Sequence, residues 1–225
     1  MSRYQTSFIF DLDGTLVDTV YQHVFAWHKA LEMEGIDLAF WRIHRKIGMS
    51  GGLFTNMLLR ETNLQIDQAR IERLRRNHTA AYKELAPSIR LLPGSRELLA
   101  ALTDAQIPWA IATSGRMETA RSALDLLGID LDKVPVVTRD QVERAKPDPD
   151  LFLTAAERLG VDAETASVVG DSVWDMLAAR RARSLGVGVL SGGYGQDELQ
   201  QAGAYRVYED PADLLKHLDE VGGRR

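Results

Sequence analysis

The chain of 225 residues contains no cysteine, so it can form no disulfide framework, no thiolate metal site and no cysteine nucleophile. It also lacks any run close to the roughly 18 consecutive apolar residues that indicate a membrane-spanning helix. Its first residues do not contain the apolar stretch of a signal peptide. These absences lead us to expect a cytoplasmic protein with no membrane partner.

An excess of positive charge is missing as well. The 27 lysines and arginines are outnumbered by 32 aspartates and glutamates, which leaves a net charge of −5. This balance disfavours nucleic acid or an anionic membrane as a partner of the whole protein. The run of Arg70, Arg73, Arg75 and Arg76 is a local exception, and a solvated helix face is its usual explanation.

The residues that are present are typical of a globular protein, with 45% apolar and 26% charged. A chain of this length forms one large domain or two smaller ones, and it can bury enough surface to fold without a metal. After a short apolar run at residues 7–10, there is almost no strand character between about residues 20 and 86.

This segment is predicted to be helical. Val20, Val24, Trp27 and Leu31 recur at helical spacing, and Gly35 closes the helix. Further helices are predicted at residues 38–46, 52–61 and 67–85. Four helices with short connections indicate an all-helical unit, which we place at residues 17–87.

From Pro87 onward, short apolar runs alternate with helical patterns, which is typical of a parallel sheet covered on both faces. The predicted strands are residues 107–112, 134–137, 166–169, 185–190 and 205–207. The predicted helices are residues 95–105, 117–127, 150–159, 173–184, 196–202 and 211–220. With residues 7–11 as the first strand, we predict an α/β fold whose core is a doubly wound, Rossmann-like parallel sheet. Residues 1–16 and 88–225 form this core, and the four-helix unit is inserted into it.

Polar motifs follow several of these strands, and in an open parallel sheet ligands bind beyond the carboxyl ends of the strands. The motifs are Asp11-Leu12-Asp13-Gly14-Thr15, Thr113-Ser114-Gly115, Lys146-Pro147-Asp148-Pro149 and Gly170-Asp171-Ser172, with Asp175 close behind. Taken singly, each has a structural explanation as a turn, a helix cap or a first-turn acid. The order of all four, each at a strand end or a helix entry, favours one shared site.

The residue types in this set suit a phosphoryl group. A carboxylate at Asp11 would be repelled by a phosphate, at a cost of about 4 kcal/mol for a separation near 4 Å and an effective dielectric constant near 20. Asp11 and Asp171 offer the hard oxygen ligands that Mg²⁺ prefers, and Lys146 adds a positive charge. Thr113 and nearby backbone N–H groups can hold phosphate oxygens, while Asp13 is free for proton transfer.

The four motifs resemble those of the haloacid dehalogenase superfamily, in the arrangement with an α-helical cap inserted after the first motif. The likeness covers nearly the whole chain. It implies that Asp11 is a nucleophile that forms an aspartyl-phosphate and that Asp13 acts as the acid and the base. It also implies that Thr113, Ser114 and Lys146 bind the phosphoryl group.

The same resemblance implies Mg²⁺ as the cofactor. Its ligands would be Asp11, Asp171 and the backbone carbonyl of Asp13, with Asp175 bound directly or through water. Dehalogenases of the superfamily lack an aspartate at the position of Asp13 and need no metal. The resemblance therefore favours phosphate chemistry over carbon–halogen cleavage.

Features of the cap bear on the choice between a phosphatase and a phosphosugar mutase. Mutases similar to β-phosphoglucomutase have an arginine after a Gly-x-Ser turn, whereas here Gly48-Met49-Ser50 is followed by Gly51. Water would then be the acceptor, and Gly192-Gly193-Tyr194-Gly195 is similar to phosphoglycolate-phosphatase-like proteins. We expect a phosphomonoesterase acting on a small phosphorylated metabolite. A phosphosugar mutase and a non-catalytic binding or regulatory protein of the same fold are the alternatives.

Three residues of the cap are further candidates. By resemblance, His23 is a hinge or support residue of the active site. Arg45 and Lys46 are candidates for a loop that faces the substrate, with a charged helix end as the other explanation. We expect a monomer or a weak dimer.

Overall fold

Six parallel strands form the central sheet of the computed structural model, which describes residues 6–49, 52, 54, 57 and 67–223. In sheet order the strands are β5 (Val136–Val137), β4 (Trp109–Ala112), β1 (Ser7–Phe10), β6 (Ala166–Gly170), β7 (Leu185–Val189) and β8 (Ala204–Tyr208). Phe8 of β1 pairs with Trp109 on one side and with Ser167 on the other, so β1 is central. The chain runs outward from β1 first toward β5 and then toward β8, which confirms the predicted doubly wound sheet.

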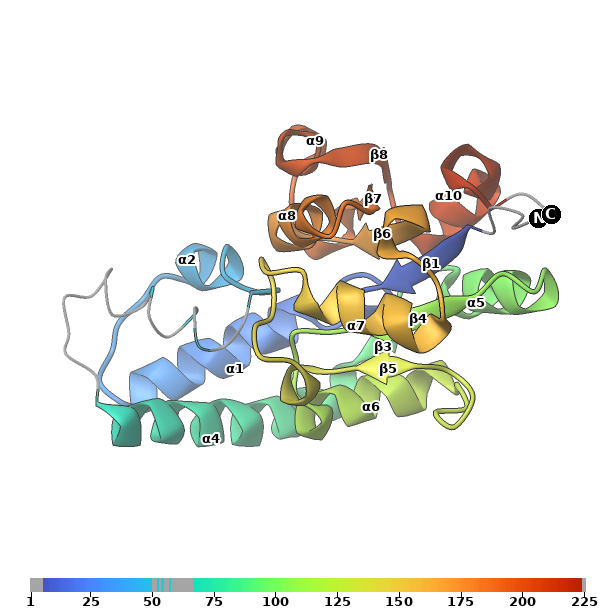
Figure 1. The fold of residues 1–225 in the computed structure, drawn as a ribbon. Coiled ribbons are helices and arrows are strands. Elements are labelled where there is room, and N and C mark those ends of the chain that lie inside the picture. The colour runs from blue at the N-terminus through green and yellow to red at the C-terminus, as the bar shows by residue number, and fades with distance from the viewer. Residues whose placement is uncertain (1–5, 50–51, 53, 55–56, 58–66, 224–225) are drawn as a thin grey trace.

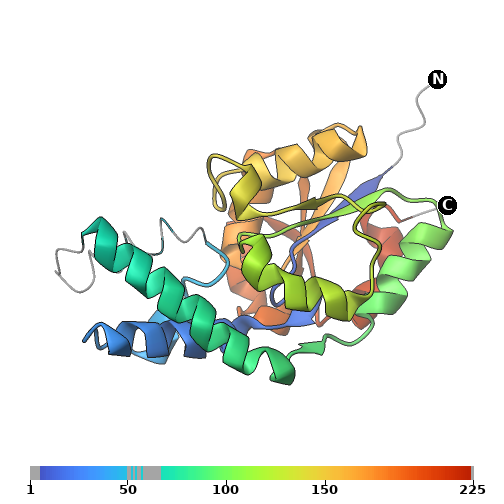
Figure 2. The ribbon, with the colours of Figure 1, turned by 90° about the horizontal axis from the view of Figure 1, so that it is seen from below.

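Helices cover both faces of the sheet (Figure 2). Because side chains alternate along a strand, Phe8 and Phe10 point to one face and Ile9 to the other. The first face packs against α5, α6 and α10, and the second packs against α7 and α8, while α9 contacts α8. These helices are α5 (Ser95–Asp104), α6 (Met117–Leu127), α7 (Asp150–Leu159), α8 (Val173–Arg181), α9 (Gln196–Ala202) and α10 (Pro211–Lys216). Short 3₁₀ helices are η1 (Ala86–Ser88), η2 (Arg139–Gln141), η3 (Ala163–Thr165), η4 (Leu190–Gly192) and η5 (Leu218–Val221).

The helical insertion contains α1 (Val20–Met33), α2 (Phe40–His44) and α4 (Gln68–Leu85). Helices α1 and α4 lie side by side and extend beyond one end of the core (Figure 1). Val24 and Leu31 of α1 are buried in one cluster with Leu74 of α4, as the helical spacing of the apolar residues predicted. The helix predicted at residues 52–61 lies mostly outside the described residues; of its members, Phe54 is buried in the same cluster.

Two strands that the sequence did not predict join the insertion to the core. β2 (Val17–Asp18) and β3 (Arg90–Leu91) pair antiparallel, so the two ends of the insertion leave the core next to each other. Near the end of α4, Tyr82 is buried among the residues of the main core. The end of the insertion that is nearest to the core therefore packs on the core through Tyr82, and β2 joins it to the chain just after the first motif. None of the helices in the described part of the chain is long and apolar enough to cross a membrane.

Candidate active site

The sheet brings the predicted motifs together at one edge. Asp11 follows β1, Thr113 follows β4 and Asp171 follows β6, and these three strands are neighbours. Because they are parallel, their carboxyl ends meet on the same side. Lys146 reaches the site from the loop before α7, and its ammonium group forms ion pairs with Asp11 and Asp175.

Lys146 is completely buried, and its nitrogen lies 2.7 Å from Oδ1 of Asp175. Burial alone would lower the pKa of Lys146, but the charges of Asp11 and Asp175 and their hydrogen bonds raise it. The ammonium group therefore stays charged, and it pairs with the carboxylate that follows β1 and with one from α8.

Asp11, Asp171 and Asp175 form an acidic cluster, with carboxylate oxygens within 4.8 Å of one another. All three are buried, and Lys146 forms ion pairs with two of them, Asp11 and Asp175. Burial raises the pKa of Asp11 to about 7, with Lys146 opposing the shift and Asp175 and Asp13 adding to it. Burial and repulsion from Asp175 and Asp11 likewise raise the pKa of Asp171 well above its usual range. Three hard oxygen donors that one lysine does not neutralise fit a divalent cation such as Mg²⁺.

Neighbouring groups fix the orientation of these carboxylates. The hydroxyl of Thr15 donates a hydrogen bond of 2.9 Å to Asp171. Oδ2 of Asp175 accepts hydrogen bonds from the backbone N–H of Ser172 at 3.1 Å and from its hydroxyl at 2.5 Å. This capping box at the start of α8 makes Asp175 both a structural cap and a member of the acidic cluster.

Gly192 is a site residue that the sequence did not identify as such. A Cβ atom at this position would lie 1.8 Å from Oδ2 of Asp171. The loop after β7 therefore packs its bare backbone against the carboxylate. The pair Gly192-Gly193 just after a predicted strand was the available signal, because adjacent glycines often mark a close backbone approach.

Asp13 lies outside the acidic cluster and faces the insertion. Its carboxylate accepts hydrogen bonds from Thr19 at 2.7 Å and from Thr113 at 3.2 Å, and lies 3.3 Å from Nε2 of His23. Burial would raise the pKa of Asp13, but the charge of His23 and the hydrogen bonds from His23, Thr19 and Thr113 together lower it. The structure thus brings Asp13, Thr113 and His23 together.

His23 contacts His78 of α4, which the sequence did not identify as a site residue. Nδ1 of His23 lies 3.2 Å from Nε2 of His78. The ring of Tyr82 stacks on His23 at 4.1 Å, and that of Trp27 stacks on His78 at 4.2 Å between centroids. Burial, and then the charge of His23, lower the pKa of His78 well below its usual range, so His78 is neutral. The spacing of four between His78 and Tyr82 was the only sequence signal that they share a face.

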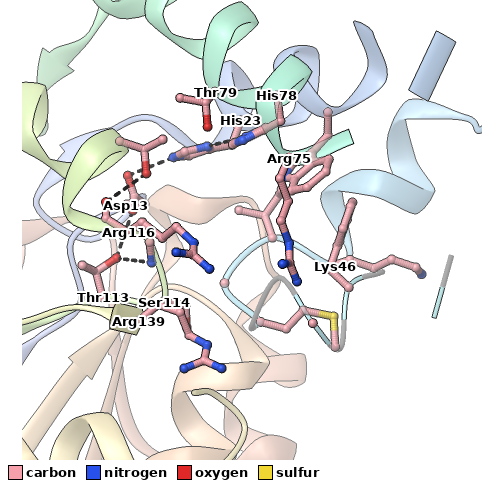
Figure 3. Close-up of a pocket in the computed structure, with 18 of the residues that line it drawn as sticks. Asp13, His23, Lys46, Arg75, His78, Thr79, Thr113, Ser114, Arg116 and Arg139 are labelled. Carbon is pink, nitrogen blue, oxygen red and sulfur yellow. Dashed lines mark hydrogen bonds and ion pairs between the residues drawn. The ribbon is translucent and has the colours of Figure 1, made fainter. Parts of the chain in front are cut away.

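A cavity of about 180 Å³ opens between the core and the insertion (Figure 3). Asp11, Asp13 and Thr113 line it together with Ser114, whose buried hydroxyl has no hydrogen-bond partner among the described residues. Lys46 and His23 line the same cavity from the side of the insertion.

Arg45, the third candidate of the insertion, does not line this cavity. Its guanidinium forms an ion pair with Glu198 and lies 4.4 Å from the ring centroid of Tyr194. Arg45 therefore links the insertion to the loop and helix after β7. Ser50 and Gly51, on which the distinction from a mutase depends, lie outside the described residues.

Comparison with known proteins identifies relatives over most of the chain. The protein-family model for haloacid dehalogenase-like hydrolases matches residues 6–183. The chain is 32% identical over 227 residues to a phosphoglycolate phosphatase of Rhodospirillum rubrum, covering 96% of this chain and 93% of the relative. It is 33% identical over 219 residues to a β-phosphoglucomutase of Bacillus subtilis, covering 93% and 92%. A hydrolase from Pseudomonas syringae has a crystal structure with a TM-score of 0.94 and 57% identity, covering 96% of this chain and 99% of that one.

We predict that Gly192→Ala displaces Asp171 and disrupts the acidic cluster. The added methyl group cannot occupy the same space as Oδ2 of Asp171, so the carboxylate has to move. Disturbing the support of a metal ligand typically costs about 10- to 100-fold in metal affinity. Isothermal titration calorimetry with Mg²⁺ measures this loss of affinity.

Gly195→Ala in the same loop is the matched control. A Cβ there would meet Glu198 at 3.5 Å, an ordinary contact, and the backbone φ of −76° suits alanine. We expect Gly195→Ala to bind Mg²⁺ within about 2-fold of the unmodified protein, since surface changes of this kind have small effects. Equal affinity in Gly192→Ala and the control would show that Asp171 does not ligate the ion.

Proposed function

The chain belongs to the haloacid dehalogenase-like hydrolases, and on that premise we propose that it is a Mg²⁺-dependent phosphomonoesterase acting through an aspartyl-phosphate. Its substrate would be a small phosphorylated metabolite. The observation that carries the proposal is the position of Asp11. It lines the cavity, and it also forms an ion pair with Lys146 and belongs to the acidic cluster with Asp171 and Asp175. A carboxylate so placed can attack a phosphoryl group that enters the cavity.

In the first step, one oxygen of Asp11 is held by Lys146 and the other attacks phosphorus. The bond from Asp11 to phosphorus forms while the ester bond from phosphorus to the leaving oxygen breaks. Asp13 gives its proton to that leaving oxygen. Asp13 is ionised beside His23 in the free protein, and a phosphate dianion against it would raise its pKa and favour uptake of that proton.

In the second step, Asp13 accepts a proton from water as the water attacks the aspartyl-phosphate. The bond from Asp11 to phosphorus breaks, which releases inorganic phosphate and restores both aspartates. Thr113 and Ser114 would donate hydrogen bonds to the phosphoryl oxygens, because both hydroxyls line the cavity and that of Ser114 has no other partner among the described residues.

Asp11, Asp171 and Asp175 would hold the Mg²⁺, with the backbone carbonyl of Asp13 as a further proposed ligand. When bound, the ion would neutralise charge on the carboxylates and on the phosphoryl oxygens. Without it, the substrate would meet an acidic cluster that one lysine only partly compensates.

A phosphosugar mutase is the second candidate, because the relative from Bacillus subtilis is a β-phosphoglucomutase of similar length. The two functions differ in the group that accepts the phosphoryl from Asp11: water in a phosphatase, a second sugar hydroxyl in a mutase. Incubation with β-glucose 1-phosphate and a trace of β-glucose 1,6-bisphosphate separates them. Inorganic phosphate as the product supports the phosphatase, and glucose 6-phosphate supports the mutase.

We predict that Asp11→Asn folds normally and has no measurable turnover, because an amide is a poor nucleophile. Asp13→Asn keeps the nucleophile and loses proton transfer, which is typically worth about 10²- to 10⁴-fold in rate. A nitrophenyl phosphate has an acidic leaving group, so its first step is partly spared and Asp13→Asn should accumulate phosphoenzyme. Mass spectrometry of the intact protein detects the added phosphate.

The control for both variants is Asp18→Asn, because Asp18 is the exposed aspartate of the neighbouring strand β2. It should retain full turnover and accumulate no phosphoenzyme. Phosphate found on Asp11→Asn, or on Ser114 in any variant, would contradict the assignment of the nucleophile.

We also predict that Mg²⁺ stabilises the folded protein. An ion that binds only the native state adds about 2.7 kcal/mol at 100 times its Kd, which raises the Tm of a protein of this size by about 5–10 °C. Asp171→Asn should abolish most of this shift, whereas Asp104→Asn at the exposed end of α5 should preserve it. Thermal unfolding with Mg²⁺ and with a chelator measures the shift, and an unchanged shift in Asp171→Asn would remove Asp171 from the site.

A further inference from the structure

Three arginines line the cavity and have no role in the chemistry proposed above. Arg75 comes from α4, Arg116 from the start of α6 and Arg139 from η2, so three separate segments contribute them. Figure 3 shows their guanidinium groups directed toward the cavity from different sides. We call these three residues the arginine cluster.

Arg75 differs from the other arginines of its helix. Arg70 and Arg73 form ion pairs with Glu34, and Arg76 is exposed, as a solvated helix face predicts. Arg75 is instead half-buried at the cavity and forms no hydrogen bond or ion pair with the described part of the chain. Burial, followed by the charges of Arg116 and Arg139, lowers the pKa of Arg75, and the charge of Glu72 opposes this shift. The protein thus holds like charges near one another in a partly enclosed space, at a cost that a bound anion would remove.

Contacts with neighbouring groups position the other two members of the cluster. Nη1 of Arg116 lies 2.9 Å from Oδ1 of Asp140. Arg139 donates hydrogen bonds to the backbone carbonyls of Val142 at 2.6 Å and of Glu143 at 3.2 Å. Carbonyl oxygens orient a guanidinium without neutralising it, so Asp140 supplies the one carboxylate paired with the cluster among the described residues.

Under the proposed function, the transferring phosphoryl group would have its own partners in Asp11, Thr113 and Ser114, which line the same cavity. Its charge is met there by Lys146 and the proposed Mg²⁺. A solvated helix face does not account for Arg75, and the phosphoryl chemistry does not require it. The cluster is therefore available for another part of the substrate.

We propose that Arg75, Arg116 and Arg139 form a second anion subsite, and that the substrate is a small phosphomonoester carrying a second anionic group. This inference rests on the proposed phosphatase function and narrows its substrate class. Either a carboxylate or a second phosphate satisfies the chemistry, since guanidinium groups bind both through paired hydrogen bonds.

Matched substrates test the proposal directly. Glycerol 3-phosphate carries no second anion, 3-phosphoglycerate carries a carboxylate, and propane-1,3-diol bisphosphate carries a second phosphate. With saturating Mg²⁺, we expect kcat/KM for at least one compound with a second anionic group to exceed that for glycerol 3-phosphate by about 10- to 100-fold, as for hydrogen bonds to charged groups. The better of the two identifies the second anion as carboxylate or phosphate.

The variants Arg75→Gln and Arg75→Lys link this preference to the cluster. Arg75→Gln should lower the ratio of kcat/KM between the favoured compound and glycerol 3-phosphate by about 10-fold or more, chiefly through KM. Arg75→Lys should restore part of the ratio because it keeps the charge. Arg76→Gln, one residue along the helix and exposed, should leave the ratio unchanged. Thermal unfolding of each variant shows whether it is folded.

A ratio near one in the unmodified protein would overturn the inference and leave the phosphatase function standing. So would an equal loss on all three substrates in Arg75→Gln, because the arginine would then serve the transferring phosphoryl group. If no compound is hydrolysed, the proposed function fails, and binding still tests the subsite. In that case 3-phosphoglycerate or the bisphosphate should raise the Tm more than glycerol 3-phosphate, and Arg75→Gln should remove the difference.

Discussion

Three buried carboxylates around one buried lysine are the constraint on which the rest of this site depends. Asp11, Asp171 and Asp175 are brought together by neighbouring parallel strands and by the cap of α8, and Lys146 pairs with two of them. Such a group is unfavourable unless positive charge is added, because burial penalises each ionised carboxylate. Under the proposed function, the arrangement would need a cation before it could accept a phosphate. The close approach of the loop at Gly192 limits how far the carboxylates can move to relieve their repulsion.

The insertion supplies what the core lacks. The core contributes the carboxylates, whereas the histidine pair and Arg75 come from α1 and α4. Their placement depends on how the insertion sits on the core, and that contact involves more than β2 and β3. Arg45 pairs with Glu198, and Nε2 of His44 donates a hydrogen bond of 2.8 Å to the carbonyl of Gly192. The same loop thus approaches Asp171 and contacts the insertion, so the packing of the insertion and the shape of the acidic cluster are coupled.

Local pattern predicted the fold and the core of the site because both follow from regular geometry. Alternating strands and helices specify a parallel sheet, and a parallel sheet places residues such as Asp11 and Asp171 at one edge whatever the details of packing. The residues that were missed depend on contacts distant in sequence. Nothing local separates Arg75 from Arg76, and only the packing of α4 on the core turns one of them into the cavity. β2 and β3 have two residues each, too few to show a period. Arg45 was a candidate either for a loop facing the substrate or for a charged helix end, and its partner Glu198 lies 153 residues away.

Groups of opposite charge line the cavity, and under the proposed function this difference would orient a substrate. Asp11, with Asp171 and Asp175 next to it, would repel an anion until a cation is bound. The arginine cluster would attract an anion with or without that cation. A compound with a single phosphate could therefore bind at the arginines without presenting that phosphate to Asp11. A compound with two anionic groups could place one at the arginines while the other reaches Asp11. Contacts outside the reacting atoms would then help to position the phosphoryl group, which is how such contacts increase turnover.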